Sequence, residues 1–276
     1  MYDRFLFIGL GGSGGSTLGY LKEEISRWLV QSGQRPAIPR GWQFLHIDTP
    51  TNSDANPRVD EDEYLGLIKT GVQFRDVQAM LDGNENLHEE IQTWRVDPGA
   101  LPIPLSMGAG QFRAVGQTVA IAYARDIRIR IERSVQRLSQ AETFAELELV
   151  YQQATKNKSD GDSKLHIVVI SSLAGGSGAG LVQMVCDAVR AMDTDAGEAV
   201  FGILYTPQVF STLPDAQTMG VQPNSLAAVS ELLNGYWWNG SAALDSDQGA
   251  VSPKVNVALD QAGLPKAIMR SGPSFP

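Results

Sequence analysis

The chain has 276 residues, of which 43% are hydrophobic, and a formal net charge of −9. It is long enough to bury the core of one large or two small domains, and its acidity disfavours nucleic acid or an anionic membrane as the main partner. The single cysteine, Cys186, excludes an internal disulfide. No apolar run approaches the roughly 20 residues that span a bilayer. We therefore expect a soluble cytoplasmic protein without membrane insertion.

The first half of the chain opens with alternating strand and helix patterns. Residues 4–10 form a short apolar run that predicts a strand, and apolar residues recur at helical spacing over 16–31. Residues 41–48 predict a second strand, which ends at Asp48. The polar stretch that follows indicates loops with short helical segments near residues 64–68, 72–81 and 87–94.

The second half continues this alternation as far as residue 240. Its pattern predicts strands over 164–170 and 198–206, and helices over 111–138, 142–155, 181–192 and 224–238. Such an order predicts an α/β fold with a mostly parallel sheet and helices on both faces. We expect one domain over residues 1–240 and a tail over 241–276, with only a weak strand at 254–259.

Glycine-rich segments follow the predicted strands. GLGGSGG (9–15) follows the first strand, AGGSGAG (174–180) follows the strand at 164–170, and GAG (108–110) follows a short stretch that we expect to be another strand. The carboxyl ends of parallel strands meet at one edge of a sheet. Amide groups at helix starts favour anions there, and missing Cβ atoms let phosphate oxygens approach. The sequence therefore predicts a phosphate-bearing nucleotide as ligand.

The first segment alone leaves the kind of nucleotide open. Gly9, Gly11 and Gly14 match the G-x-G-x-x-G fingerprint of NAD- or FAD-dependent enzymes. The acidic residue expected about 20 residues later comes late, because Asp48 lies 34 residues after Gly14. Neither glycine-rich turn contains the Gly-Lys-Ser/Thr ending of a P-loop. A dinucleotide-dependent enzyme stays one candidate.

The segment AGGSGAG resembles the signature loop Gly-Gly-Gly-Thr-Gly-Ser-Gly of the tubulin/FtsZ superfamily, with conservative changes at three of seven positions. Other stretches resemble that family's loops in the same order: GLGGSGGS, HIDTPTNSD, GAGQFRAVGQ, YTPQVF and VQPNSLAAVSELL. The resemblance covers about residues 4–240. It implies a Rossmann-like GTP-binding domain of a filament-forming cytoskeletal protein that associates with itself.

The resemblance also implies which residues contact GTP or GDP. The first glycine-rich segment would line the α- and β-phosphates, the third segment the γ-phosphate, and the signature loop the other side of the phosphate chain. Asp48 would contact Mg²⁺ through water, and three residues would lie by the ribose. The implied site consists of Gly11, Gly12, Ser13, Gly14, Ser16, Asp48, Gly108, Ala109, Gly110, Gln111, Gly175, Gly176, Ser177, Gly178, Pro207, Gln222 and Asn224.

The chain departs from the family pattern in places that bear on hydrolysis. Pro50 replaces an acidic residue of tubulins, which leaves Asp54 as a substitute near magnesium, and Ser211 or Gln222 replaces a ribose-contacting glutamate. No long helix is predicted before VNVALD (255–260), so we expect a fragment that lacks the acidic loop by which one subunit completes hydrolysis in the next. Such a chain would bind GTP better than it hydrolyses it. A non-polymerising tubulin-like module within a larger assembly is the remaining alternative.

Two further polar residues have simpler interpretations. Arg113 follows the third glycine-rich segment and could neutralise a phosphate, but a solvated arginine on a helix face is the preferred interpretation. His46 lies within a strand pattern and is interpreted as a packed histidine rather than a catalytic base.

Overall fold

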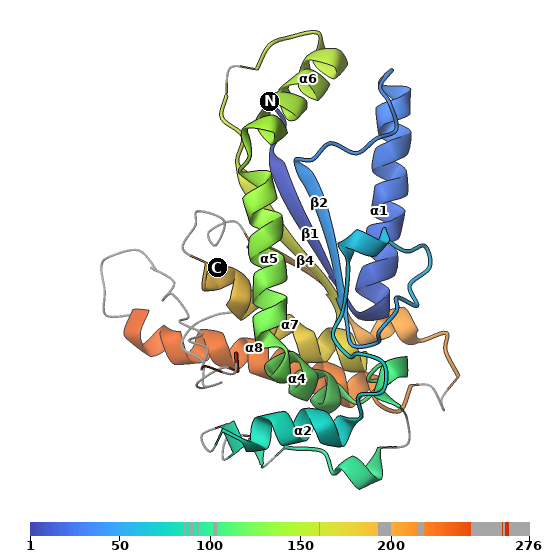
Figure 1. Cartoon of the computed structure of the whole chain (residues 1–276), viewed down its shortest axis with the longest axis vertical. Coiled ribbons are helices and arrows are strands. Elements are labelled where there is room, and N and C mark those ends of the chain that lie inside the picture. The colour runs from blue at the N-terminus through green and yellow to red at the C-terminus, as the bar shows by residue number, and fades with distance from the viewer. Residues whose placement is uncertain are drawn as a thin grey trace.

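The computed structural model describes residues 1–84, 87–88, 91–92, 94–101, 104–159, 161–192, 200–214, 218–243, 261 and 263–264 (Figure 1). In this part of the chain five strands form one parallel sheet in the order β3-β2-β1-β4-β5. The strands are β1 (Arg4–Leu10), β2 (Trp42–Asp48), β3 (Tyr64–Gly66), β4 (Leu165–Ser172) and β5 (Val200–Tyr205). The predicted α/β fold with a parallel sheet is confirmed.

Helices cover both faces of the sheet, as predicted. They are α1 (Gly11–Gln31), α2 (Phe74–Asp82), α4 (Arg113–Ala122), α5 (Ala124–Leu138), α6 (Ala141–Thr155), α7 (Gly176–Arg190) and α8 (Val221–Ala243). Figure 1 shows α1 and α5 on opposite sides of the strands. Since α8 runs to Ala243, it crosses the expected domain limit at residue 240, and the division into domain and tail stays a prediction.

The alternation of side chains along β1 explains this layered arrangement. Successive residues of a strand point to opposite faces, so Leu6 and Ile8 face one layer while Phe5 and Phe7 face the other. Leu6 and Ile8 are fully buried in the core that contains α4, α5 and α7. Phe5 and Phe7 pack in a second cluster with Leu18 of α1. Burial on both faces holds the carboxyl ends of the strands in a fixed arrangement.

Three local predictions were wrong. Residues 64–66 form the edge strand β3, paired with His46–Asp48, instead of a helical segment. A run of three residues is too short to show a periodicity, so its pairing with β2 decides its structure. The helix predicted over 111–138 is broken at Tyr123, whose φ of −109° and ψ of 22° are not helical.

The third error concerns the segment before Gly108. A 3-10 turn, Leu105–Met107, precedes it where we expected a strand. The left-handed φ of 99° at Gly108 then redirects the chain. The strand predicted at 254–259 and the segment VNVALD lie outside the described residues.

Candidate functional site

The three glycine-rich segments meet in one cleft of about 170 Å³. Leu10, Asp48 and Ser172 line it, so it lies at the carboxyl ends of β1, β2 and β4. The predicted site residues that line this cleft are Gly11, Gly12, Ser13, Asp48, Gly108, Ala109, Gly110, Gly175, Gly176, Ser177 and Gly178. The parallel topology brings the segments after β1, β2 and β4 together, and residues 108–110 reach the same cleft from a 3-10 turn.

Two helices begin at this cleft. α1 starts at Gly11 and α7 starts at Gly176, and neither has a side-chain cap or an acidic residue in its first turn. The first N–H groups of a helix have no intrahelical partner, and the helix dipole places partial positive charge there. The amide of Gly176 donates to the carbonyl oxygen of Gly110 at 2.9 Å. This bond joins the signature loop to the third glycine-rich segment, residues 108–110. The cleft thus combines two positive helix ends with walls of low side-chain volume, which suits an anion.

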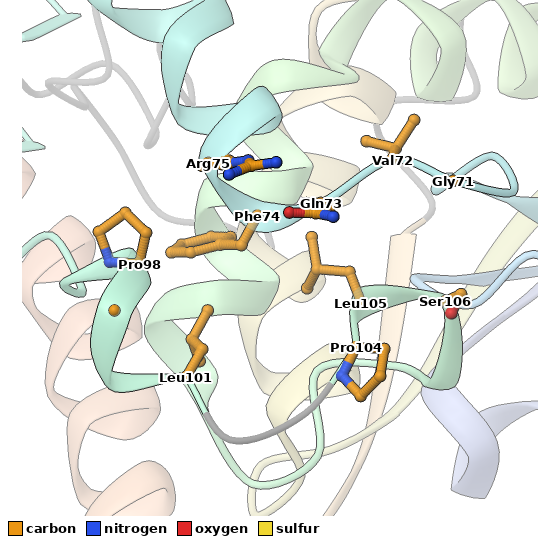
Figure 2. Close-up of a pocket in the computed structure, with 11 residues that line it drawn as sticks. Gly71, Val72, Gln73, Phe74, Arg75, Pro98, Leu101, Pro104, Leu105 and Ser106 are labelled. Atoms are coloured by element: carbon orange, nitrogen blue, oxygen red, sulfur yellow. The ribbon is translucent and has the colours of Figure 1, made fainter.

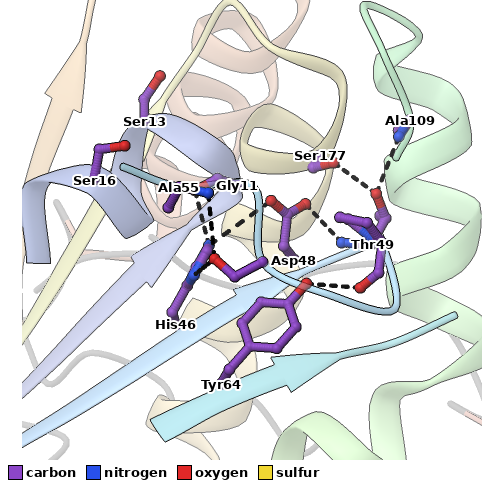
Figure 3. Close-up of polar contacts among 12 residues, drawn as sticks. Gly11, Ser13, Ser16, His46, Asp48, Thr49, Ala55, Tyr64, Ala109 and Ser177 are labelled. Carbon is purple, nitrogen blue, oxygen red and sulfur yellow. Dashed lines mark hydrogen bonds and ion pairs between the residues drawn. The ribbon is translucent and has the colours of Figure 1, made fainter. Parts of the chain in front are cut away.

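Thr49 connects three of the loops around the cleft (Figure 3). Its side chain is fully buried, and its Oγ1 lies 2.7 Å from Oγ of Ser177. The same oxygen accepts a hydrogen bond of 3.0 Å from the amide of Ala109. One hydroxyl therefore fixes the loop after β2 against both the signature loop and the third segment.

Asp48 and His46 form a buried polar pair beneath the first turn (Figure 3). Oδ1 of Asp48 accepts a hydrogen bond of 2.6 Å from the amide of Thr49, and Oδ2 lies 3.7 Å from Nε2 of His46. His46 Nε2 is also 3.1 Å from the carbonyl oxygen of Gly11, and Nδ1 is 3.2 Å from Oγ of Ser53. Because a carbonyl oxygen only accepts, Nε2 carries a hydrogen and donates to Gly11.

Sequence reasoning did not assign His46 to the site. The sequence did contain a signal for this role. Residues two positions apart on a strand point to the same face, so His46 and Asp48 share a face. The imidazole also explains Gly15: a Cβ atom at that residue would overlap the ring. His46 is packed, as interpreted, and it also ties the first turn to the end of β2.

The edge strand β3 supports the loop that follows Asp48. The hydroxyl of Tyr64 donates to the carbonyl oxygen of Pro50 at 2.6 Å. Burial, and then the nearby carboxylates of Asp48 and Asp54, raise the pKa of Tyr64. The raised pKa favours the protonated hydroxyl, which is the form that donates to Pro50.

Two predicted residues of the first turn lie behind the cleft rather than in its lining. Gly14 is packed against β4, where an added Cβ would meet the carbonyl oxygen of Ile170 at 2.5 Å. Oγ of Ser16 accepts a hydrogen bond of 3.1 Å from the amide of Asn56. Their contact with a ligand stays a prediction.

The predicted residues near the ribose are likewise not among the lining residues. Asn224 donates from Nδ2 to the carbonyl oxygens of Gln111, at 2.8 Å, and Ala174, at 2.9 Å. Gln111 accepts at Oε1 from the amide of Gly220 at 2.7 Å. These two residues connect α8 to the loops, whereas Pro207 lies in a 3-10 turn and Gln222 is exposed on α8.

Arg113 differs from its preferred interpretation as a solvated side chain. It is buried, and its Nη1 donates to Oε1 of Glu231 on α8 at 2.8 Å. Its Nη2 pairs with the other carboxylate oxygen of Glu231. The guanidinium is therefore engaged in joining α4 to α8.

The acidic residues at the cleft fit a magnesium ion that shares its coordination with phosphate. Asp48 is buried at the inner wall, and Asp54 is exposed near Gly12. Among the described residues, no group of three or more His, Cys, Asp or Glu could hold a metal by itself. Mg²⁺ is commonly held by one or two carboxylates together with phosphates and water, so this set is sufficient only with a phosphate ligand.

A larger pocket of about 730 Å³ lies beside the cleft (Figure 2). Figure 2 shows Phe74, Leu101 and Leu105 around it, with Arg75 at one side. Ser106 lines this pocket and Met107 lines the cleft, so the two hollows share one 3-10 turn. The larger pocket contains no predicted site residue and is walled largely by apolar side chains.

Comparison with known proteins identifies the class to which this fold and cleft belong. A family model described as "Tubulin like" matches residues 6–257, and the chain therefore belongs to the tubulin-like family. The resemblance seen in the sequence is confirmed.

One solved structure that matches is a GTPγS-form protofilament of TubZ from Bacillus thuringiensis serovar israelensis. It shares 12% sequence identity with a TM-score of 0.40, over 88% of this chain and 45% of that chain. The chain thus spans less than half of that TubZ chain. No curated protein matches. Among the described residues, no helix has the length and apolar character needed to cross a membrane.

Proposed function

We propose that the chain binds GTP or GDP with the phosphates in the glycine-lined cleft. The observation that carries this proposal is the convergence of three glycine-rich segments and two uncapped helix starts on one cleft in a tubulin-like chain. Amide groups would bind phosphate oxygens, and the hydroxyls of Ser13 and Ser177 would add donors. The choice of guanine follows from the family.

The cleft supports this proposal better than an NAD- or FAD-dependent enzyme. The dinucleotide fingerprint concerns the first turn alone, whereas here the signature loop and the segment 108–110 line the same cleft. Bound magnesium would neutralise phosphate charge, with Asp48 and Asp54 as the carboxylates available to hold it.

We further propose that the protein assembles with itself in the cytoplasm and that hydrolysis is completed between subunits. The family supports self-assembly. Attack on a γ-phosphate needs a positioned group that orients water. Among the described residues of the cleft, the carboxylates are Asp48 and Asp54, of which the first is buried and hydrogen-bonded. A contribution from a neighbouring subunit would complete such a site.

Calorimetric titration of the purified chain with GTP, GDP, ATP and NAD, each with and without Mg²⁺, tests the proposal. We expect GTP and GDP to bind, with magnesium strengthening GTP binding, and NAD not to bind. Tight NAD binding without guanine nucleotide binding would overturn it. Sedimentation with GTP tests assembly separately, since a chain that binds GTP and stays monomeric would contradict only the assembly.

A further inference from the structure

A second polar pocket, of about 380 Å³, lies away from the glycine-lined cleft. It is bounded by α5, the start of β2 and the 3-10 turn Glu61–Glu63. Gln43 lines this pocket and Asp48 lines the cleft. Asp48 lies five positions after Gln43 on β2, which is roughly 16 Å at about 3.3 Å per residue. The two hollows are therefore separate sites.

Three arginines line this pocket, which we name the arginine pocket: Arg40, Arg130 and Arg137. Arg130 and Arg137 lie on one face of α5 together with Ser134, because the spacing 130, 134, 137 follows the helical repeat. Two carboxylates, Asp62 and Glu63, line the same pocket, and Nε of Arg40 lies 4.0 Å from Oε2 of Glu146, so the guanidinium groups left for a ligand are those of Arg130 and Arg137.

Of the two carboxylates at the arginine pocket, that of Glu63 is engaged elsewhere. Glu63 forms an ion pair with Lys22 and accepts a hydrogen bond of 3.0 Å from the amide of Asp60. In the part of the chain that the structure describes, the guanidinium groups of Arg130 and Arg137 make no hydrogen bond or ion pair with any residue. The side chains of Arg130 and Arg137 are therefore without a direct partner among the described residues.

Arg130 is the clearer case of an arginine without a partner. Its Nε is buried without a hydrogen-bond partner. Burial, and then the positive charge of Arg137, lower the pKa of Arg130, and Asp62 only partly opposes this. Buried polar groups are nearly always hydrogen-bonded, so an unpartnered guanidinium nitrogen beside a cavity indicates a missing acceptor.

We propose that the arginine pocket binds a phosphate group carried by a small molecule or by a phosphorylated side chain. The planar guanidinium group matches phosphate in a bidentate manner, and Gln43, Ser134 and Gln140 supply neutral donors at the same wall. The volume suits a small ligand. The carboxylate of Asp62 at the wall disfavours an extended polyanion such as nucleic acid. This site is independent of the proposed guanine-nucleotide function.

Titration of the full chain with inorganic pyrophosphate, glucose 6-phosphate and a phosphoserine peptide tests the proposal. Arg130→Gln and Arg137→Gln should each weaken binding of at least one probe about tenfold or more. Arg133→Gln is the matched control, because Arg133 lies on the same helix, is exposed and does not line the pocket. Phosphate binding in the glycine-lined cleft is common to all three variants, so the difference between them isolates the arginine pocket. The probe that loses affinity identifies the source of the phosphate.

Stability measurements separate a ligand site from a structural role. Without phosphate, Arg130→Gln should unfold at the same or a higher denaturant concentration than the parent, because it removes a nitrogen, Nε, that is buried without a hydrogen-bond partner. The probe should raise the melting temperature of the parent and of Arg133→Gln more than that of Arg130→Gln. Equal binding by all variants, or a loss of stability in Arg130→Gln without phosphate, would overturn the proposal.

Discussion

The first glycine-rich turn (residues 9–15) and the second, the signature loop (residues 174–180), have similar compositions. They are packed against different parts of the molecule. The first turn lies against β4 at Gly14 and against the ring of His46 at Gly15. The second turn lies against the third segment, since a Cβ at Gly176 would meet the carbonyl oxygen of Gly110 at 2.6 Å. Many of these glycines are therefore required for contact between loops, whatever ligand the cleft holds.

Each turn nevertheless offers one glycine that faces little or no protein. A Cβ at Gly12 would meet only Oδ1 of Asp54, at the ordinary distance of 3.5 Å, and a Cβ at Gly175 would meet nothing within 4 Å. Both residues line the cleft. The difference teaches that the glycines that pack the loops are distinct from the glycines that face the cleft, so mutations can separate loop packing from the proposed ligand contact.

The largest effect is expected for Gly176→Val. The added side chain would strike the backbone of residues 109, 110 and 112, which cannot move aside as a flexible side chain could. We expect the free energy of unfolding to fall by about 3 kcal/mol. Urea denaturation measures it, with Gly161→Val as control, because a Cβ at Gly161 meets nothing within 4 Å. Equal stability of both variants would show that the second turn is not packed as described.

The corresponding test of the first turn is His46→Phe. Phenylalanine fills a similar volume but loses both hydrogen bonds of the ring, to Gly11 and Ser53. Each buried hydrogen bond contributes about 1 kcal/mol, so the loss of two gives an expected decrease near ~2 kcal/mol. Thermal unfolding measures it. His166→Phe is the control, because His166 is only partly buried and bonds Asp3 at the far end of β4. A loss no larger than in the control would mean that His46 does not hold the first turn.

A smaller effect on stability, with a specific effect on binding, is expected for Gly175→Val. As the N-cap of α7, this residue tolerates valine at a loss of about 1 kcal/mol. If phosphate oxygens approach here, GTP affinity should fall more than about tenfold, which is about 1.4 kcal/mol. Calorimetry compares the variant with Gly161→Val. Undiminished GTP binding by a folded Gly175→Val would remove this turn from the proposed site.

The smallest effect is expected for Ser16→Ala. The hydroxyl of Ser16 bonds the exposed amide of Asn56 and does not line the cleft. Its loss should lower the free energy of unfolding by less than about 1 kcal/mol and leave GTP affinity within about twofold of the parent. A tenfold loss of affinity in calorimetry would instead place Ser16 at the phosphates, as the family resemblance implies.

The sequence predicted those features that depend on local pattern. β1 matches its predicted range because an apolar run is bounded by glycine, and β4 begins within one residue of the prediction. The meeting of the first glycine-rich segment and the signature loop followed from the parallel order of strands, whereas residues 108–110 reach the cleft without a preceding strand. The family resemblance then named eleven residues that line the cleft.

Features set by distant contacts could not be predicted in this way. β3 exists because it pairs with the end of β2, and Arg113 is buried because Glu231 on α8 meets it. The helical spacing of Arg130 and Arg137 is visible in the sequence, but the opposing wall at Gln43 is not. In each case the decisive partner is more than ten residues away, beyond any local periodicity.

Asn224 connects α8 directly to two loops of the cleft. Its amide group bonds the last residue before Gly175 and the first residue after Gly110, so one side chain bridges the outer ends of two loops. Further along α8, Glu231 forms an ion pair with Arg113 at the start of α4. α8 is therefore tied by hydrogen bonds both to two loops that line the cleft and to the helix that follows the third segment, so its position and theirs are fixed together.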